Sequence, residues 1–482
     1  MEIAYNNKGG TSLKNELQRG LSNRHIQLIA IGGAIGTGLF LGSGQTISLT
    51  GPSILITYLI IGFILFMFMR GLGELLLSNT KYKSFVDIAN NQLGPYAGFL
   101  IGWTYWLSWI TSSMSDLTAM GSYVNYWSTA IPNWLTILCI VLLLIVFNSL
   151  GAKLFGEVEF WFSMIKVITV IALIVVGVIV IFLGINSYGT TASFSNLYTD
   201  GFFTNGPYGF LMSFQMAVYS FIGIELIGVT AGETKNPEKS IPKAVNSVPI
   251  RILLFYIGSL AVIMSIMPLN KISPDNSPFV QVLAILGIPF AASAINFVVI
   301  TAAASATNSG IFSDSRMLYG LSKEKQAPKI MAKTNKHGVP HIAMFISTSI
   351  LLIAVMLNYI FPNAIKLFIY ITTVSTVLYL LVWVLIIISY IKYARSNKDE
   401  HKRNKFKLKG GHYAAYIVLA FFFFAFVLLL FSNETRRAVY FLPIWIIATI
   451  LMYLRYKEKK RKISKMYFES SGKSYTPTRN ID

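Results

Sequence analysis

The chain has 482 residues, of which 54% are hydrophobic and only 12% are charged. Soluble globular proteins carry about 25% charged residues, so this composition excludes a soluble globular protein. The formal net charge of +20 would suit a nucleic-acid-binding protein, but the basic residues are placed in the way that is typical of a membrane protein.

Apolar stretches close to the length that crosses a bilayer as a helix recur along nearly the whole chain. About twelve spans are predicted, at 26–49, 53–70, 97–128, 133–150, 157–184, 207–232, 249–268, 281–313, 342–361, 364–391, 413–432 and 437–456. The stretches at 97–128 and 281–313 are long enough for long or tilted helices. The only cysteine, Cys139, lies in an apolar stretch, which excludes a disulfide framework. The predicted fold class is therefore an all-α membrane protein.

Basic residues concentrate in the N-terminal segment and in every second connection between the spans. The connection at 314–340 carries Arg316, Lys323, Lys325, Lys329, Lys333 and Lys336. By the positive-inside rule, this pattern predicts that both termini are cytoplasmic. We interpret 1–25 as a cytoplasmic segment, 26–456 as the transmembrane domain and 457–482 as a basic cytoplasmic tail. Such a tail favours lipid headgroups as its contact, and no nucleic-acid partner is expected.

A glycine run, 32–38, interrupts the middle of the first span. Each glycine costs about 1 kcal/mol of helix propensity. Unwound backbone in hydrocarbon is tolerated only where it lines a cavity. The run therefore predicts a helix broken at a binding site. The alternative is a close-packing face of small residues, but the glycines are too dense and too local for a packing stripe.

The sixth span repeats this anomaly around Tyr219–Glu225, followed by Gly228 and Gly232. Because five spans lead from one break to the next, the two broken helices enter the membrane from opposite sides. Paired breaks of this kind are typical of an inverted repeat with a binding site at the membrane midplane. The predicted repeats are about 26–184 and 207–391, with peripheral helices at 413–456.

The two breaks offer complementary backbone groups. Free N–H groups of Gly36, Thr37 and Gly38 form a positive pole that suits a carboxylate. Carbonyl groups near Ala34 and in the sixth span suit an ammonium group. A small molecule that carries both charges is an α-amino acid, although inorganic ions can also use such sites. The predicted substrate site comprises Ala34, Gly36, Thr37, Gly38, Tyr219, Phe221 and Ile222.

Ionisable residues inside apolar spans are costly and usually functional. Lys166 lies in the middle of the fifth span, where proton binding can be coupled to access to water; the alternative is a lysine that snorkels to a helix end. Glu225 follows the second break and is either a proton carrier or a hydrogen-bonding acid between helices. Asp116 is a weaker candidate for the cavity, and Glu233 suits a structural ion pair.

No enzyme site competes with this interpretation. The chain has five histidines, and their spacing does not suit a metal site. The glycine run lacks the Gly-Lys-Ser/Thr ending of a phosphate-binding loop. We therefore expect a protein that is not an enzyme, that uses no cofactor or metal, and that draws its energy from an ion gradient.

Several segments resemble bacterial amino acid permeases of the amino acid–polyamine–organocation superfamily. They are 24–40 (RHIQLIAIGGAIGTGLF), 71–74 (GLGE), 156–162 (GEVEFWF) and 221–233 (FIGIELIGVTAGE). Segments 62–84 and 295–318 are most similar to the members that transport D-serine, D-alanine and glycine. The resemblance covers nearly the whole chain.

This resemblance implies a five-plus-five inverted repeat of the leucine-transporter type, with helices 1 and 6 broken, and proton-coupled uptake. It places the substrate carboxylate on the N–H groups of Gly36, Thr37 and Gly38. The amine then faces the carbonyl groups of Ala34, Tyr219 and Ile222. In some relatives a lysine in the fifth span takes the place of a sodium ion, and Lys166 matches that position.

The resulting hypothesis is a proton-coupled importer of glycine, D-alanine and D-serine, with L-alanine as a further candidate substrate, working by alternating access. The expected setting is the bacterial cytoplasmic membrane, with the lipid bilayer, protons and a zwitterionic amino acid as partners. A monomer or a weak homo-oligomer is expected. The alternatives are a permease of the same family for proline or GABA, an amino acid exchanger, and, less favoured, a non-transporting sensor.

Overall fold

The computed structural model describes residues 35–79, 82, 84–149, 152–187, 190–230, 236–287, 289–335, 338–361 and 363–470. Apart from two short antiparallel strands, β1 (Asn186–Ser187) and β2 (Thr190–Thr191), the regular structure in these ranges is helical. Nine helices of the described chain are long and apolar enough to cross a membrane. The predicted fold class, an all-α membrane protein, is confirmed.

The predicted spans all contain helices of the structure. The helices in the first half of the chain are α2 (Thr37–Phe40), α3 (Gly42–Thr50), α4 (Ile54–Ser78), α5 (Phe85–Leu93), α6 (Pro95–Val124), α7 (Asn133–Ser149) and α8 (Ala152–Phe182). Next come α9 (Asn196–Thr199), α10 (Gly206–Tyr219), η3 (Ile224–Leu226), α11 (Ile227–Thr230), α12 (Pro237–Asn246), α13 (Val248–Arg251), η5 (Ile252–Gly258) and α14 (Ser259–Ile266). The remainder are α15 (Pro278–Ile285), α16 (Pro289–Lys323), α17 (His341–Ile360), α18 (Ala364–Ser396), α19 (Lys398–Arg403), α20 (Gly411–Leu428), α21 (Asn433–Val439) and α22 (Phe441–Ser470).

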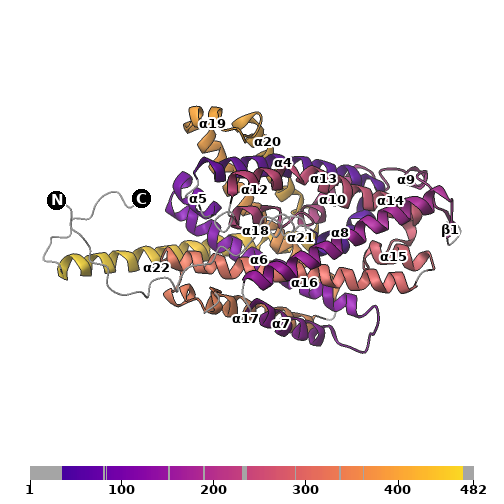
Figure 1. The fold of residues 1–482 in the computed structure, drawn as a ribbon, viewed down its shortest axis with the longest axis horizontal. Helices are drawn as coiled ribbons and strands as arrows, with labels where there is room; N and C mark the ends of the chain where they lie inside the picture. The colour runs from indigo at the N-terminus through magenta and orange to yellow at the C-terminus, as the bar shows by residue number, and fades with distance from the viewer. Residues whose placement is uncertain are drawn as a thin grey trace.

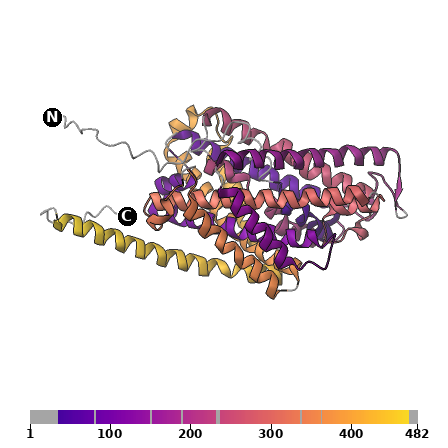
Figure 2. The ribbon, with the colours of Figure 1, turned by 60° about the horizontal axis from the view of Figure 1, so that its bottom comes forward.

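Helix α6 lies at the centre of the bundle, where it packs against both α16 and α18. Small residues allow the close approach of α6 and α16: a Cβ atom at Gly102 would lie 2.8 Å from a methyl carbon of Leu321. Helices α7 and α17 pack together at one edge of the bundle (Figure 1). Helix α22 extends beyond the bundle in both views (Figure 2).

Some predicted boundaries differ from the structure. The stretch 281–313 is not one long helix, because the chain turns at Gly287 with φ +73° between α15 and α16. Helix α16 then continues to Lys323, so that Arg316 is a buried residue of the helix rather than its end. Helix α22 continues to Ser470, into the segment predicted as a basic tail. Hydropathy locates apolar segments, but capping and turn geometry decide where a helix stops.

The break in the sixth span is confirmed. Helix α10 ends at Tyr219, and the chain turns through Gly223, whose φ is +96°, before η3 and α11 begin. In the first span, the chain bends at Ile35 and Gly36 before α2 begins at Thr37. The part of the glycine run before Ile35 lies outside the described residues, and the inverted repeat stays a prediction.

The two interrupted spans touch each other at Gly38. A Cβ atom at this position would lie 2.6 Å from Cα and 3.0 Å from the backbone N of Ser220. Backbone atoms cannot move aside as a flexible side chain can, so only glycine allows this approach. The start of α2 and the turn after α10 therefore form one unit at the centre of the protein.

Candidate functional site

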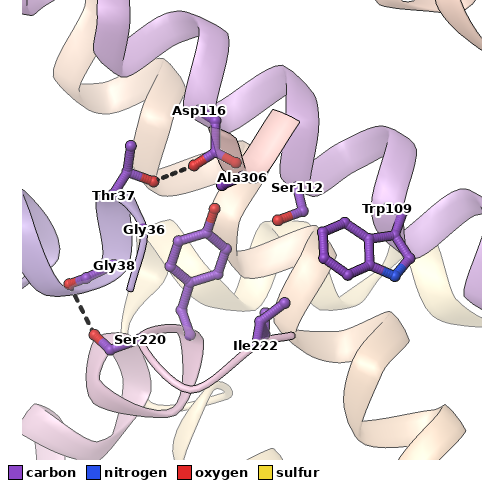
Figure 3. A pocket seen from close by; sticks show the side chains of 10 residues that line it. Gly36, Thr37, Gly38, Trp109, Ser112, Asp116, Ser220, Ile222 and Ala306 are labelled. Atoms are coloured by element: carbon purple, nitrogen blue, oxygen red, sulfur yellow. Dashed lines mark hydrogen bonds between the residues drawn. The ribbon is translucent and has the colours of Figure 1, made fainter. Parts of the chain in front are cut away.

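A pocket lies where the two interrupted spans meet (Figure 3). It is lined by Gly36, Thr37, Gly38, Trp109, Ser112, Asp116, Tyr219, Ser220, Ile222 and Ala306. These residues come from the start of α2, from α6, from the break after α10, and from α16. The predicted site residues of the two spans are thus brought together, although 180 or more positions separate them in the sequence.

The start of α2 presents unpaired backbone donors to this pocket. The first N–H groups of a helix have no intrahelical acceptor. Within the described residues, Gly36, Thr37 and Gly38 donate no hydrogen bond to another backbone group, and the Thr37 N–H faces the carboxyl group of Asp116. The side chain of Thr37 donates a hydrogen bond of 2.5 Å to Oδ1 of Asp116 on α6. One wall of the pocket therefore combines free N–H groups with a buried carboxyl group.

The break after α10 is held by hydroxyl groups. Ser220 Oγ donates to the carbonyl oxygen of Gly38 at 2.8 Å, and the Tyr256 hydroxyl donates to the Ser220 carbonyl oxygen at 2.8 Å. The hydroxyl groups of Tyr219 and Ser115 are hydrogen-bonded to each other. The Tyr219 carbonyl oxygen accepts from the Ile222 N–H at 3.1 Å, which leaves it a second lone pair.

One predicted substrate-site residue, Phe221, is not among those that line this pocket. The Phe221 ring stacks on Tyr256, with 4.6 Å between centroids and 9° between planes, and meets Tyr58 edge-on at 5.6 Å. Phe221 thereby packs behind the break rather than lining it. Ala34 lies outside the described residues, as does Glu233.

Lys166 is fully buried on α8 and reaches the first interrupted span. Its Nζ donates to the Ile35 carbonyl oxygen at 3.4 Å and to Ser305 Oγ at 2.9 Å. Ser305 in turn donates to Oε1 of Glu159 at 2.5 Å. Glu159 lies two turns before Lys166 on the same helix face, a spacing that could have revealed this acidic neighbour in the sequence. Lys166 does not snorkel to a helix end in this structure.

Glu225 is also fully buried, just beyond the pocket. Its Oε2 accepts from the Gly223 N–H and from Trp383 Nε1, both at 3.3 Å. Its Oε1 has no hydrogen-bond partner. One half of this carboxyl group is therefore anchored, whereas the other half is available to a proton or to water.

The structure places Asp116, the weaker candidate from the sequence, in the lining of the pocket. Ser112, Ser220 and Ala306 also line the pocket and were missed by sequence reasoning. The pocket residues Trp109, Ser112 and Asp116 recur at i, i+3 and i+7 along α6. That spacing places them on one face of the helix and could have identified it as cavity-lining. Nothing in the local sequence marks Ala306, which enters the pocket only because α16 packs against α6 and α2.

Comparison with known proteins agrees with this architecture. Residues 25–466 match the family described as amino acid permease. The amino-acid permease AapA of Bacillus subtilis is 50% identical over 452 residues, which are 94% of this chain and 97% of that protein. The D-serine/D-alanine/glycine transporter of Escherichia coli is 49% identical over 449 residues, which are 93% of this chain and 96% of that protein.

An uncharacterized transporter of Bacillus subtilis, YdgF, is 52% identical over 444 residues, covering 92% of this chain and 96% of its own length. These relatives are transporters and permeases rather than enzymes. The chain is an integral membrane protein, and it belongs to the amino acid permease family.

Proposed function

We propose that this protein imports small neutral amino acids, with glycine, D-alanine and D-serine as leading substrates, and that proton entry drives the transport. The observation that carries the proposal is the pocket formed where the two interrupted spans meet. Its lining combines free N–H groups, carbonyl oxygens and the carboxyl group of Asp116, which suits a ligand with both charges. The similarity to a D-serine/D-alanine/glycine transporter supports the choice of substrates.

In this proposal the substrate carboxylate is bound by the N–H groups of Gly36, Thr37 and Gly38. The ammonium group faces the carbonyl oxygens of Ala34, Tyr219 and Ile222. A pocket that recognises mainly these shared groups accepts either hand of an amino acid whose side chain is small. Phe221 supports the break from behind, and Lys166 and Glu225 couple substrate movement to protons.

We also propose that the protein lies in the bacterial cytoplasmic membrane with both termini in the cytoplasm. The basic connections of one side support this orientation. No cofactor takes part, because the proton gradient supplies the energy. The protein works as a monomer or as a weak homo-oligomer, with residues 26–184 and 207–391 as the two inverted repeats.

Uptake of labelled glycine into proteoliposomes tests the function. We expect an inward proton gradient to stimulate uptake, and excess D-serine or D-alanine to inhibit it. Excess proline or GABA is expected to have little effect. Uptake that ignores both the gradient and D-serine would contradict the proposal. Inhibition by proline or GABA alone would instead indicate a permease for that substrate.

The site itself is tested by Gly38→Ala. The added methyl group would collide with the backbone of Ser220, so we expect glycine uptake to fall more than about tenfold. Gly320→Ala is the matched control, because a Cβ atom there meets nothing within 4 Å. Equal uptake by the two variants would contradict the proposed position of the site.

A further inference from the structure

A second group of buried polar side chains lies beside the pocket and has no role in substrate binding as proposed. It consists of Tyr105 on α6, Glu225 on η3, Asp314 on α16 and Tyr379 on α18, and we refer to it as the acid–tyrosine cluster. All four residues are at most 1% exposed. Four different elements therefore bring polar groups to one position in the interior.

Most polar atoms at the ends of the cluster's side chains lack hydrogen-bond partners. Within the described residues, both carboxyl oxygens of Asp314 and the hydroxyl group of Tyr379 form no hydrogen bond. Oε1 of Glu225 and the Tyr105 hydroxyl lie near each other but without hydrogen-bond geometry. Buried polar groups in proteins are nearly always hydrogen-bonded, and exceptions indicate a functional role or a bound water or ion. The rings of Tyr105 and Tyr379 are in edge contact, and Asp314 and Glu225 are both within electrostatic range of the two phenol groups.

The cluster adjoins the pocket on one side. On α16, Asp314 lies about 12 Å along the helix from the pocket residue Ala306. Tyr105 precedes the pocket residue Trp109 by one turn of α6, and the rings of Tyr105 and Tyr379 lie 6.1 Å apart. Glu225 follows the pocket residue Ile222 in the chain. By the predicted orientation, this side of the pocket faces the cytoplasm.

No described cation neutralises Asp314. Arg316, on the same helix, places its guanidinium over the Phe312 ring at 3.1 Å from the centroid and donates to the Phe312 carbonyl oxygen. Lys166 and Glu159 of α8 contact α16 at Ser305 instead. Ser305 lies about 13 Å from Asp314 along the axis of α16. The 3-10 turn Lys329–Ala332 and α17 also pack against α16. Neither Lys329 of that turn nor His341 of α17 forms a hydrogen bond with Asp314.

An ionised carboxyl group without a partner is very costly in such a setting, whereas a protonated one is much less so. We propose that Asp314 is a second proton-binding carboxyl group, which holds a proton while the cluster is closed and releases it when the pocket opens toward the cytoplasm. In the reverse step, the empty pocket returns to the outside, and Asp314 takes up its next proton from that side through the pocket. This inference rests on the proposed proton-coupled transport and adds a proton site to it.

The test measures protons moved per glycine in proteoliposomes, with a pH-sensitive dye and labelled glycine in the same vesicles. We expect Asp314→Asn to lower this ratio by about half. The amide of asparagine does not titrate, so the variant loses one of its two proton-binding carboxyl groups. Glycine binding and glycine exchange are expected to persist. Asp314→Ser is the second variant, and Asp275→Asn, at an exposed position, is the control with an unchanged ratio.

A proton-to-glycine ratio that stays unchanged in Asp314→Asn or Asp314→Ser would overturn the inference. Failure of both variants to fold would also overturn it, because it would give Asp314 a structural role that a neutral group cannot fill. If the unaltered protein transports glycine without protons, the proposed function fails instead. The two failures are therefore distinguishable.

Discussion

Two buried glutamates of this protein have opposite surroundings. Glu74 on α4 accepts hydrogen bonds from the Tyr390 hydroxyl at 2.8 Å and the Leu408 N–H at 2.9 Å, and it is paired with His401 at 2.5 Å. Both of its oxygens are thus engaged. Glu225 has donors on one oxygen only.

The difference separates an acid that joins parts of the fold from an acid that is free to change its protonation. Glu74 ties α4 to α18 and to the connection that contains α19, because its three partners come from those segments. Hydrogen bonds from this many donors fix the position of the Glu74 side chain. Glu225 has donors on one oxygen only, and Asp314 has none within the described residues, so the state of both acids depends on access to water.

The largest effect is expected for Glu74→Ala. The substitution leaves His401, Tyr390 and the Leu408 N–H without their acceptor, so we expect the free energy of unfolding to fall by about 3 kcal/mol. Thermal unfolding in detergent measures the loss. Glu434→Ala, on the exposed surface of α21, is the control and should be near neutral. A Glu74→Ala protein as stable as the control would contradict the structural role of Glu74 and its contrast with Glu225.

Lys166→Ala tests whether a buried group that has hydrogen-bond partners can also couple protons to transport. Lys166 has such partners and is proposed to couple protons. We expect accumulation of glycine against a gradient to fall about tenfold, whereas exchange of internal for external glycine persists. Uptake and counterflow in the same vesicles separate the two activities. Unchanged accumulation would remove Lys166 from the mechanism.

Glu225→Gln is expected to retain the fold, because an amide of the same shape still accepts from Gly223 and Trp383. Stimulation of glycine uptake by an inward proton gradient should fall by about half or more, since one titrating group is lost. The measurement compares uptake with and without the gradient. If Glu225→Gln folds poorly but its folded fraction still responds fully to the proton gradient, Glu225 is a structural acid like Glu74.

The smallest effect is expected for Trp383→Phe, which removes one donor to Glu225 at 3.3 Å and keeps most of the aromatic packing. We expect a loss of stability of about 1 kcal/mol, with substrate binding retained. Thermal unfolding and glycine binding measure the two effects. A destabilisation as large as that of Glu74→Ala would show that the two glutamates are equally important to the fold.

The spans and the two breaks were predictable because apolar length and glycine density are local properties of the sequence. Gly36, Thr37, Gly38 and Tyr219 were placed in one pocket from such local signals and the inverted-repeat argument. The bond between Thr37 and Asp116 joins residues 79 positions apart. It depends on how α2 packs against α6, which no local pattern contains.

The same reasoning explains why the acid–tyrosine cluster was missed. Asp314 follows an apolar stretch and precedes a basic one, so it resembles a helix end in the sequence. The structure extends α16 to Lys323 and thereby buries Asp314. Tyr105 and Tyr379 are indistinguishable in the sequence from aromatic residues that contact lipid. Only the packing of α6, α16 and α18 brings these groups together.

The most direct test of proton-coupled amino acid transport is the pH change inside proteoliposomes when glycine is added without an imposed gradient. The proposed function predicts that the interior acidifies as glycine enters, that excess D-serine blocks glycine entry, and that Lys166→Ala abolishes the acidification. Entry of labelled glycine with no change of internal pH would contradict the account.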